Sequence, residues 1–139
     1  FLFEAMVFEN REREFMDAKT LCGLMKKAQE QSYGDGLDPD FRHPYMWICK
    51  SHYYGPTFYN FPYAFGGLFA RGLYAQYQKE GAAFVPKYKK LLHTTPIATA
   101  EDTALTAGID LTDKNFWRSA LQIIADDIDR FCELVENPQ

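Results

Sequence analysis

Apolar residues recur at three- and four-residue steps along most of this chain, which is the spacing of one face of an α-helix. The clearest run lies in residues 61–77 and consists of Phe61, Phe65, Leu68, Phe69, Leu73 and Tyr77. Asn60 directly before it is a favourable N-cap, and Gly81 beyond it suits the left-handed residue that ends many helices. Pro62 falls in the first turn, where its missing N–H costs no hydrogen bond. The pattern therefore predicts a helix between Asn60 and Gly81.

The segment before this helix contains a long amphipathic pattern and a turn. Apolar side chains spaced by seven residues predict a single helix over residues 2–32. The spacing is marked by Phe8, Phe15 and Cys22. Aspartates, glycines and a proline crowd residues 33–40, which predicts a turn. Residues 42–51 are expected to form a strand-like or short helical lead-in to the segment that follows.

Three further helices are predicted after Gly81. One covers residues 84–93, and a second begins at a capping-box-like Thr99 and ends at Gly108. Thr112 or Asp113 caps the last helix, whose apolar stripe reaches almost to the C-terminus. The stripe consists of Phe116, Ala120, Ile124, Ile128, Phe131 and Val135. No alternation of period two persists along the sequence, so we expect an all-α fold of about five helices.

Composition narrows the class of protein. The chain has 139 residues, of which 47% are hydrophobic, 17% aromatic and 24% charged, enough to bury a core. The net charge of −4 argues against nucleic acid as a partner. No apolar run approaches the ~20 residues that a bilayer span needs, so no membrane association is expected. The three cysteines are odd in number and lack CxxC spacing, which favours reduced thiols in a cytoplasmic protein.

The first residues carry a further expectation. The chain opens without methionine, directly inside an apolar helical pattern. A natural N-terminus rarely begins in the middle of such a pattern. We therefore expect residues 1–139 to be a single helical C-terminal fragment of a longer protein.

Candidate chemistry is concentrated just before and at the start of the central helix. A histidine and four tyrosines fall within twelve residues: His52, Tyr53, Tyr54, Tyr59 and Tyr63. If Tyr59 and Tyr63 are both helical, their four-residue spacing places them on one face. Small residues at 66, 67 and 70 continue along that face. The tyrosines are either amphipathic core residues with hydroxyls at the rim, or donors that converge on a developing negative charge.

Two glutamates near the start of the chain invite a metal or general-base role. Glu4 and Glu9 lie on the first predicted helix without a histidine in phase. Charged runs on a helix most often form its solvated face. We therefore expect both to be ordinary surface residues.

The run from His52 to Gly81 resembles the oligoendopeptidase F family, zinc metallopeptidases related to thimet oligopeptidase. In that family a His-Tyr-Tyr loop and the helix after it overhang the metal site. Weaker matches extend the likeness over essentially the whole chain, in the order of the family's C-terminal portion. They are Phe1–Phe15, Leu91-Leu92 with Thr94, Gly108-Ile109-Asp110 and Phe116-Trp117. The chain departs from the family where Thr95-Pro96 replaces the usual glycine after Thr94.

The resemblance implies a C-terminal helical lobe that supplies the substrate-binding and oxyanion-stabilising half of a peptidase for short peptides. It implies that Tyr59 and Tyr63 are the phenols on the substrate and oxyanion side. It makes His52 a donor to the substrate backbone and places Tyr54 in the cleft wall. Which of the two phenols meets the oxyanion stays open.

The resemblance also implies what this chain lacks. A peptidase of this kind needs HExxH, and none of the three histidines is followed by that pattern. Zinc would be held by the N-terminal remainder of the same protein, with no zinc ligand in this chain. We expect the fragment alone to be inactive, and to expose an apolar face that the missing lobe would cover and through which the fragment could self-associate.

Two alternatives stay open. The first is a non-enzymatic helical module whose tyrosine loop binds a partner protein, because aromatic rims suit interfaces. The second is a related zinc carboxypeptidase that shares the histidine–tyrosine arrangement. A requirement for a free substrate C-terminus would distinguish the carboxypeptidase.

Overall fold

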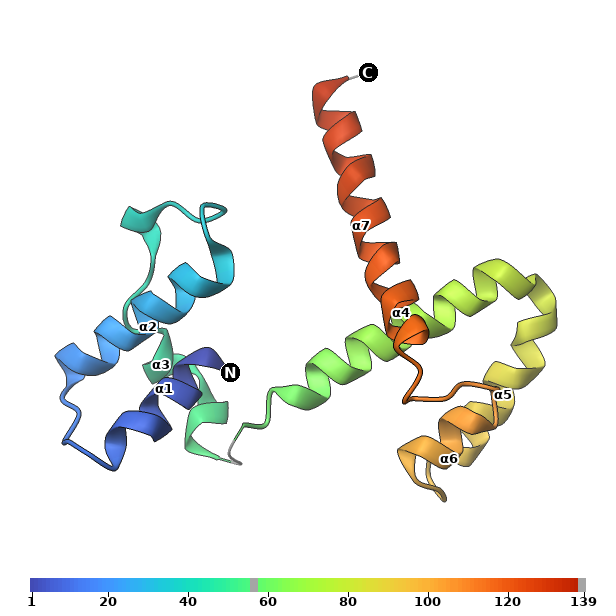
Figure 1. The fold of residues 1–139 in the computed structure, drawn as a ribbon, viewed down its shortest axis with the longest axis horizontal. Helices are drawn as coiled ribbons and strands as arrows, with labels where there is room; N and C mark the ends of the chain where they lie inside the picture. The colour runs from blue at the N-terminus through green and yellow to red at the C-terminus, as the bar shows by residue number, and fades with distance from the viewer. Residues whose placement is uncertain (56–57, 138–139) are drawn as a thin grey trace. The chain divides into compact units, whose positions relative to one another are not determined.

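The computed structural model describes residues 1–55 and 58–137. Pro56 and Thr57, which belong to the run that resembles the peptidase family, lie outside these residues. The described residues form helices joined by turns, and they contain no strand (Figure 1). The all-α prediction is therefore confirmed.

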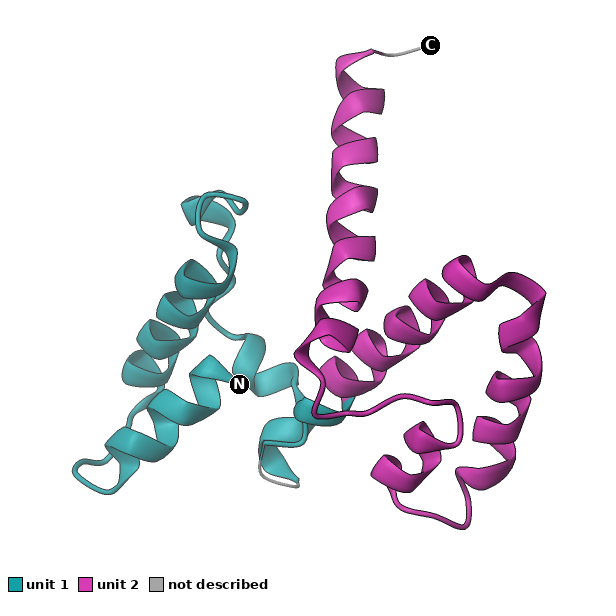
Figure 2. Cartoon of the chain, turned by 45° about the vertical axis from the view of Figure 1, so that its right-hand side comes forward, with its two compact units in different colours: residues 1–62 teal, residues 63–139 magenta. Residues whose placement is uncertain are grey.

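The chain divides into two compact units, residues 1–62 and 63–139 (Figure 2). The first unit contains α1 (Leu2–Arg11), α2 (Ala18–Tyr33) and the short α3 (Met46–Cys49). The second contains α5 (Val85–Thr94), α6 (Ala100–Leu105), α7 (Lys114–Glu136) and nearly all of α4 (Phe61–Glu80). Single 3₁₀ turns lie at Pro39–Phe41, Ser51–Tyr54 and Gly81–Phe84.

The predicted single helix over residues 2–32 is wrong, because the chain turns between α1 and α2. Asp17 caps α2, its carboxylate accepting a hydrogen bond from the Thr20 N–H at 2.8 Å. This hydrogen bond lowers the pKa of Asp17 below its ordinary value. Phe15, which would have continued the apolar stripe, is 91% exposed. The turn instead lets α1 and α2 pack against each other.

The core of the first unit is small. Phe3 of α1 is buried with Met25 and Ala28 of α2. Partly buried side chains complete the cluster: Met6, Val7, Leu21, Leu24, Trp47 and Tyr53. Of the two alternatives for residues 42–51, the helical one is confirmed by α3.

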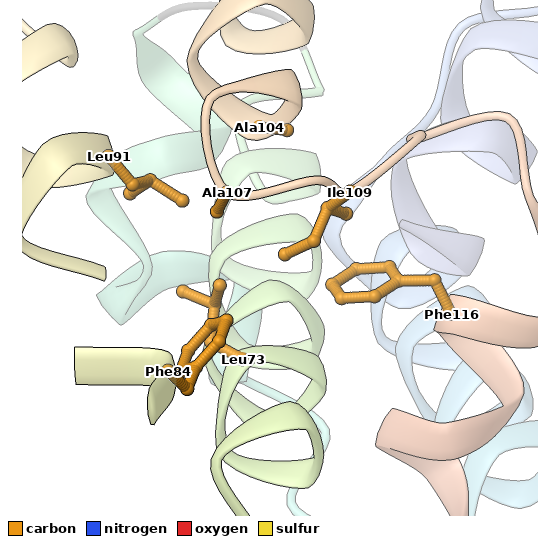
Figure 3. Close-up of a cluster of buried hydrophobic side chains, with 7 residues drawn as sticks. All are labelled: Leu73, Phe84, Leu91, Ala104, Ala107, Ile109 and Phe116. Atoms are coloured by element: carbon orange, nitrogen blue, oxygen red, sulfur yellow. The ribbon is translucent and has the colours of Figure 1, made fainter. Parts of the chain in front are cut away.

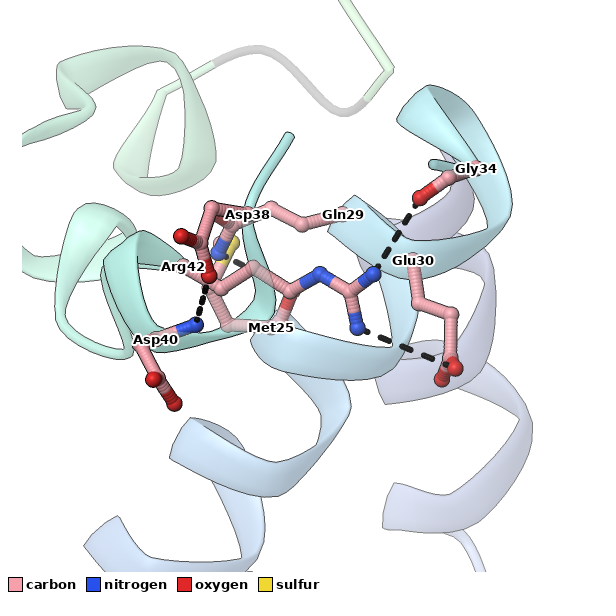
Figure 4. A network of polar contacts seen from close by, with 7 residues as sticks. All are labelled: Met25, Gln29, Glu30, Gly34, Asp38, Asp40 and Arg42. Atoms are coloured by element: carbon pink, nitrogen blue, oxygen red, sulfur yellow. Dashed lines mark hydrogen bonds and ion pairs between the residues drawn. The ribbon is translucent and has the colours of Figure 1, made fainter. Parts of the chain in front are cut away.

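The predicted turn after α2 is confirmed and is fixed to that helix by polar contacts (Figure 4). The Arg42 guanidinium donates to the Gly34 carbonyl at 3.2 Å and lies 3.7 Å from the Glu30 carboxylate. Gln29, which is buried, donates its amide to the His43 carbonyl at 2.9 Å. These contacts determine where the chain enters α3 and the segment from His52 onward.

From α4 onward most helix ends fall at the predicted signals, but α6 ends at Leu105, three residues before the predicted stop at Gly108. Asn60 directly precedes α4, and Gly81 beyond it has φ +62°. Thr99 caps α6 by accepting from the Asp102 N–H at 3.2 Å, and Gly108 has φ +78°. Asp113 caps α7 by accepting from the Asn115 N–H at 2.8 Å.

One hydrophobic cluster holds the second unit together (Figure 3). It consists of Leu73, Phe84, Leu91, Ala104, Ala107, Ile109 and Phe116, with Phe69, Leu111 and Trp117 packed against it. The Phe116 ring lies directly against Gly72 of α4, where an added Cβ would stand 2.3 Å from the ring. Gly72 is therefore the small residue on which the contact between α4 and α7 depends.

Among the described residues, no helix combines the length and the hydropathy that crossing a bilayer requires.

Candidate functional site

His52 lies in the 3₁₀ turn Ser51–Tyr54. Contacts made by the next two residues, Tyr53 and Tyr54, hold this turn in place. Tyr53 points into the core of the first unit, its ring centroid 5.0 Å from that of Phe3. Burial raises the pKa of Tyr53 above its ordinary value, and the nearby Glu4 charge adds to the shift. Tyr54 donates its hydroxyl to the Trp47 carbonyl at 2.8 Å while its side chain stays 65% exposed. His52 itself is partly buried.

Phe58 takes a backbone conformation that is unusual for its residue type. Its φ is +55°, in the left-handed region that favours glycine. Such a conformation costs about 1–3 kcal/mol and persists only where the surroundings enforce it. The Phe58 ring packs 5.3 Å from that of Phe8 on α1. The next residue in the chain is Tyr59, so the strained position lies beside a predicted site residue.

Glu4 enforces this conformation from α1. Its side chain is only 5% exposed, and its two carboxylate oxygens accept hydrogen bonds from the Phe58 N–H at 3.2 Å and the Asn60 amide at 2.7 Å. The Phe1 amino group lies 3.7 Å away. The expectation that Glu4 is an ordinary surface residue is therefore wrong, whereas Glu9 is exposed as expected. Glu4 therefore binds the backbone N–H of the residue before Tyr59 and the side-chain amide of the residue after it.

The structure brings together two of the predicted site residues. The His52 and Tyr59 rings lie with centroids 6.1 Å apart and planes inclined by 16°, a stacked arrangement. Tyr59 remains 44% exposed. An imidazole and a phenol therefore stand side by side on the first unit, with part of the phenol surface accessible.

Tyr63 is the third residue of α4 and is 63% exposed. Tyr59 precedes α4, which begins at Phe61, so the two tyrosines do not share a helix. The same-face argument from their four-residue spacing is therefore wrong. Its condition, that both be helical, fails because the Phe58–Asn60 turn is bound to Glu4.

The described side chains do not form a metal-binding group. Within residues 1–55 and 58–137, no group of three or more histidine, cysteine, aspartate or glutamate side chains is placed to hold one. His43 is exposed, and its Nδ1 accepts from the Tyr45 N–H at 3.2 Å. His93 lies in the last turn of α5, where a basic residue suits the helix dipole.

A separate groove of about 340 Å³ runs between α4 and α5 in the second unit. It is lined by Ala70, Leu73, Tyr74, Tyr77, Phe84, Val85 and Tyr88. The Tyr74 and Tyr77 rings lie 6.4 Å apart along α4. The groove offers a mostly apolar surface lined by three partly exposed tyrosines.

Comparison of the chain with protein-family models, with curated proteins and with solved structures found no match.

Removing the Glu4 carboxylate tests its role. Glu4→Ala leaves two partly buried donors without this acceptor, and we expect the Phe58 amide to exchange with solvent roughly 30-fold faster, equivalent to about 2 kcal/mol. Hydrogen exchange followed by NMR measures this directly. Glu9→Ala on the exposed face of α1 is the matched control and should leave the exchange rate within about twofold. Equal rates in the two variants would show that Glu4 does not hold the turn.

Proposed function

We propose that this chain forms the substrate-binding and oxyanion-stabilising half of a zinc-dependent oligoendopeptidase that hydrolyses short peptides. The observation that carries the proposal is the stacked His52–Tyr59 pair on a turn that Glu4 holds in a strained conformation. Strain of this kind clusters at functional sites, where it fixes the direction of a working side chain. The peptidase-like run of residues supports the same proposal.

A phenol is well suited to the proposed task. Peptide hydrolysis passes through a tetrahedral intermediate whose oxygen carries a negative charge, and preorganised donors lower its free energy. With a pKa of about 10, a tyrosine hydroxyl is neutral near pH 7 and donates without adding a competing charge. We assign this role to Tyr59 and Tyr63, a substrate-backbone contact to His52, and a place in the cleft wall to Tyr54.

In this proposal, the water is activated by a part of the protein outside this chain. Zinc would supply an activated water and polarise the substrate carbonyl. The described residues hold no metal-binding group, so the ligands would come from the N-terminal remainder of the same protein. The chain alone should therefore bind peptides without hydrolysing them.

We also propose a cytoplasmic location and peptide, not nucleic-acid, partners. Cys22, Cys49 and Cys132 are all free thiols, which suits a reducing compartment. The net negative charge disfavours contact with phosphate backbones.

The proposal is tested with the complete protein and internally quenched peptides of about ten residues, in versions with a free and an amidated C-terminus. An oligoendopeptidase cleaves both versions at internal bonds, and chelation of zinc abolishes the cleavage. Cleavage only of the free-carboxyl version would support the carboxypeptidase alternative. No hydrolysis of either version would contradict the proposal.

One observation favours a second candidate, a helical module that binds a partner protein. Phe61 and Tyr63 at the start of α4 are 68% and 63% exposed. Exposed aromatic side chains are enriched in interface cores. This candidate would predict tight binding of a folded partner without any peptide hydrolysis.

A further inference from the structure

The last helix carries an apolar face that the rest of its unit does not cover. We call the residues Leu121, Ile124, Ile128, Phe131 and Val135 the α7 seam. Their spacing is three, four, three and four residues, which is the a/d repeat of a coiled coil. Leu121, Phe131 and Val135 are 52%, 66% and 62% exposed. Figure 2 shows this part of α7 extending away from the other helices of the second unit.

The first turns of α7, in contrast to the seam, carry buried apolar residues. Phe116 is 5% exposed and Ala120 is fully buried, because both pack into the core of the second unit. These contacts hold the first turns in a helical conformation. The later turns therefore extend an existing helix and do not bear the entropic cost of nucleation. The α7 seam is thus a preformed helical surface. Contiguous apolar patches of this kind mark interaction sites on soluble proteins.

We propose that the α7 seam pairs with the α7 seam of a second copy of this chain, in antiparallel orientation. A heptad seam is filled best by another helix with the same repeat, because side chains of one insert between those of the other. A second copy supplies this repeat by symmetry. The proposal goes beyond the peptidase function and does not rest on it.

Charge decides the orientation. The N-terminal part of α7 carries Lys114 and Arg118, whereas residues 126–136 carry five acidic residues against one arginine. A parallel pair would place the two acidic ends side by side, which is destabilising. An antiparallel pair places Arg118 of one copy near the acidic end of the other. The dipoles of the two helices point in opposite directions in this arrangement, which is also favourable.

The repeat fixes the layers of the pair. In an antiparallel coiled coil an a residue faces a d residue, so Leu121 of one copy meets Phe131 of the second, and Ile124 meets Ile128. Four such layers form around the twofold axis, all from the α7 seam. Trp117 would face Val135 at each end, although its indole is partly engaged through a 2.8 Å hydrogen bond to the Leu111 carbonyl. Asp127 then lies opposite its own symmetry mate.

The association is tested first by sedimentation equilibrium of the 139-residue chain across micromolar concentrations. We expect a mass twice the 16.1 kDa of one chain. Ile128→Asp should raise the dimer dissociation constant at least 100-fold and leave the circular dichroism spectrum unchanged, because Ile128 is already 56% exposed in one copy. Gln122→Asp adds the same charge away from the seam and should leave the dimer intact. A monomer throughout the range overturns the proposal.

The orientation is tested by a matched pair of charge changes. Asp127→Asn removes the like-charge contact at the twofold axis and should tighten the dimer about three- to tenfold, whereas Asp126→Asn on the outer face should change it less than twofold. In a parallel pair Asp127 would face Cys132 of the partner, and the two variants would behave alike.

Disulfide formation tests the orientation of the pair independently, in a variant from which the native cysteines have been removed. Mixing Leu121→Cys with Phe131→Cys should give a disulfide-linked mixed dimer under mild oxidation. Leu121→Cys alone forming the linked dimer equally fast would overturn the antiparallel arrangement.

Discussion

Replacing Tyr59 or Tyr63 by phenylalanine in the complete protein is expected to lower kcat for peptide hydrolysis by about 10²–10³ in the variant that loses the oxyanion donor. Phenylalanine keeps the ring, so the stacking of position 59 on His52 is retained and only the hydroxyl is lost. The loss should appear in kcat with little change in KM, because the donor acts on charge that develops in the transition state. Zinc content should not change, since neither residue is assigned to the metal.

The control for this prediction is Tyr74→Phe. Tyr74 is also half-exposed, but it lies in the groove between α4 and α5. Its variant should retain kcat within about twofold. If Tyr59→Phe and Tyr63→Phe both keep the parental kcat, the oxyanion role is wrong.

Phe116→Ala is expected to destabilise the second unit by about 3–5 kcal/mol, the cost of removing a large buried aromatic side chain. Phe116 joins α7 to α4 by packing against Gly72 and Phe69 of α4. Urea unfolding followed by circular dichroism measures the loss. Leu105→Ala, at a position that is 58% exposed, should cost less than about 1 kcal/mol. Similar losses in the two variants would contradict the assigned core.

The same contact predicts opposite signs for two glycines of α4. Gly72→Ala forces a Cβ into the Phe116 ring, and overpacking of this kind costs about 1–3 kcal/mol. Gly66→Ala meets nothing within 4 Å and should stabilise α4 by roughly 0.5–1 kcal/mol. The pair separates the steric effect of the substitution from its effect on helix propensity.

Helix ends were predictable here because their signals are local. Asn60, Thr99 and Asp113 are polar residues directly before apolar repeats, and Gly81 and Gly108 directly follow such repeats. A cap needs only backbone groups within a few residues, so short sequence windows contain the information. The all-α class follows from the same local patterns.

The tertiary features of the candidate site were not predictable in this way. Glu4 and Asn60 are 56 residues apart, so no local pattern announces their hydrogen bond. Phenylalanine gives no sign of the positive φ found at Phe58. The break before Asp17 was missed because the seven-residue spacing of apolar residues continued across it. At Glu4 and Phe58 a contact distant in sequence outweighs the local preference, whereas the start of α2 is marked by a local cap at Asp17 that the apolar spacing concealed.

The measurement that tests the central claim most directly is the sequence of the gene upstream of the Phe1 codon. The account predicts an open reading frame that encodes HExxH on a helical pattern, followed by a further helical glutamate. Finding both would supply the zinc ligands absent from the described residues and make this chain the substrate side of the peptidase. A start codon within a few residues of Phe1, with no such motif, would contradict the account and favour the binding module.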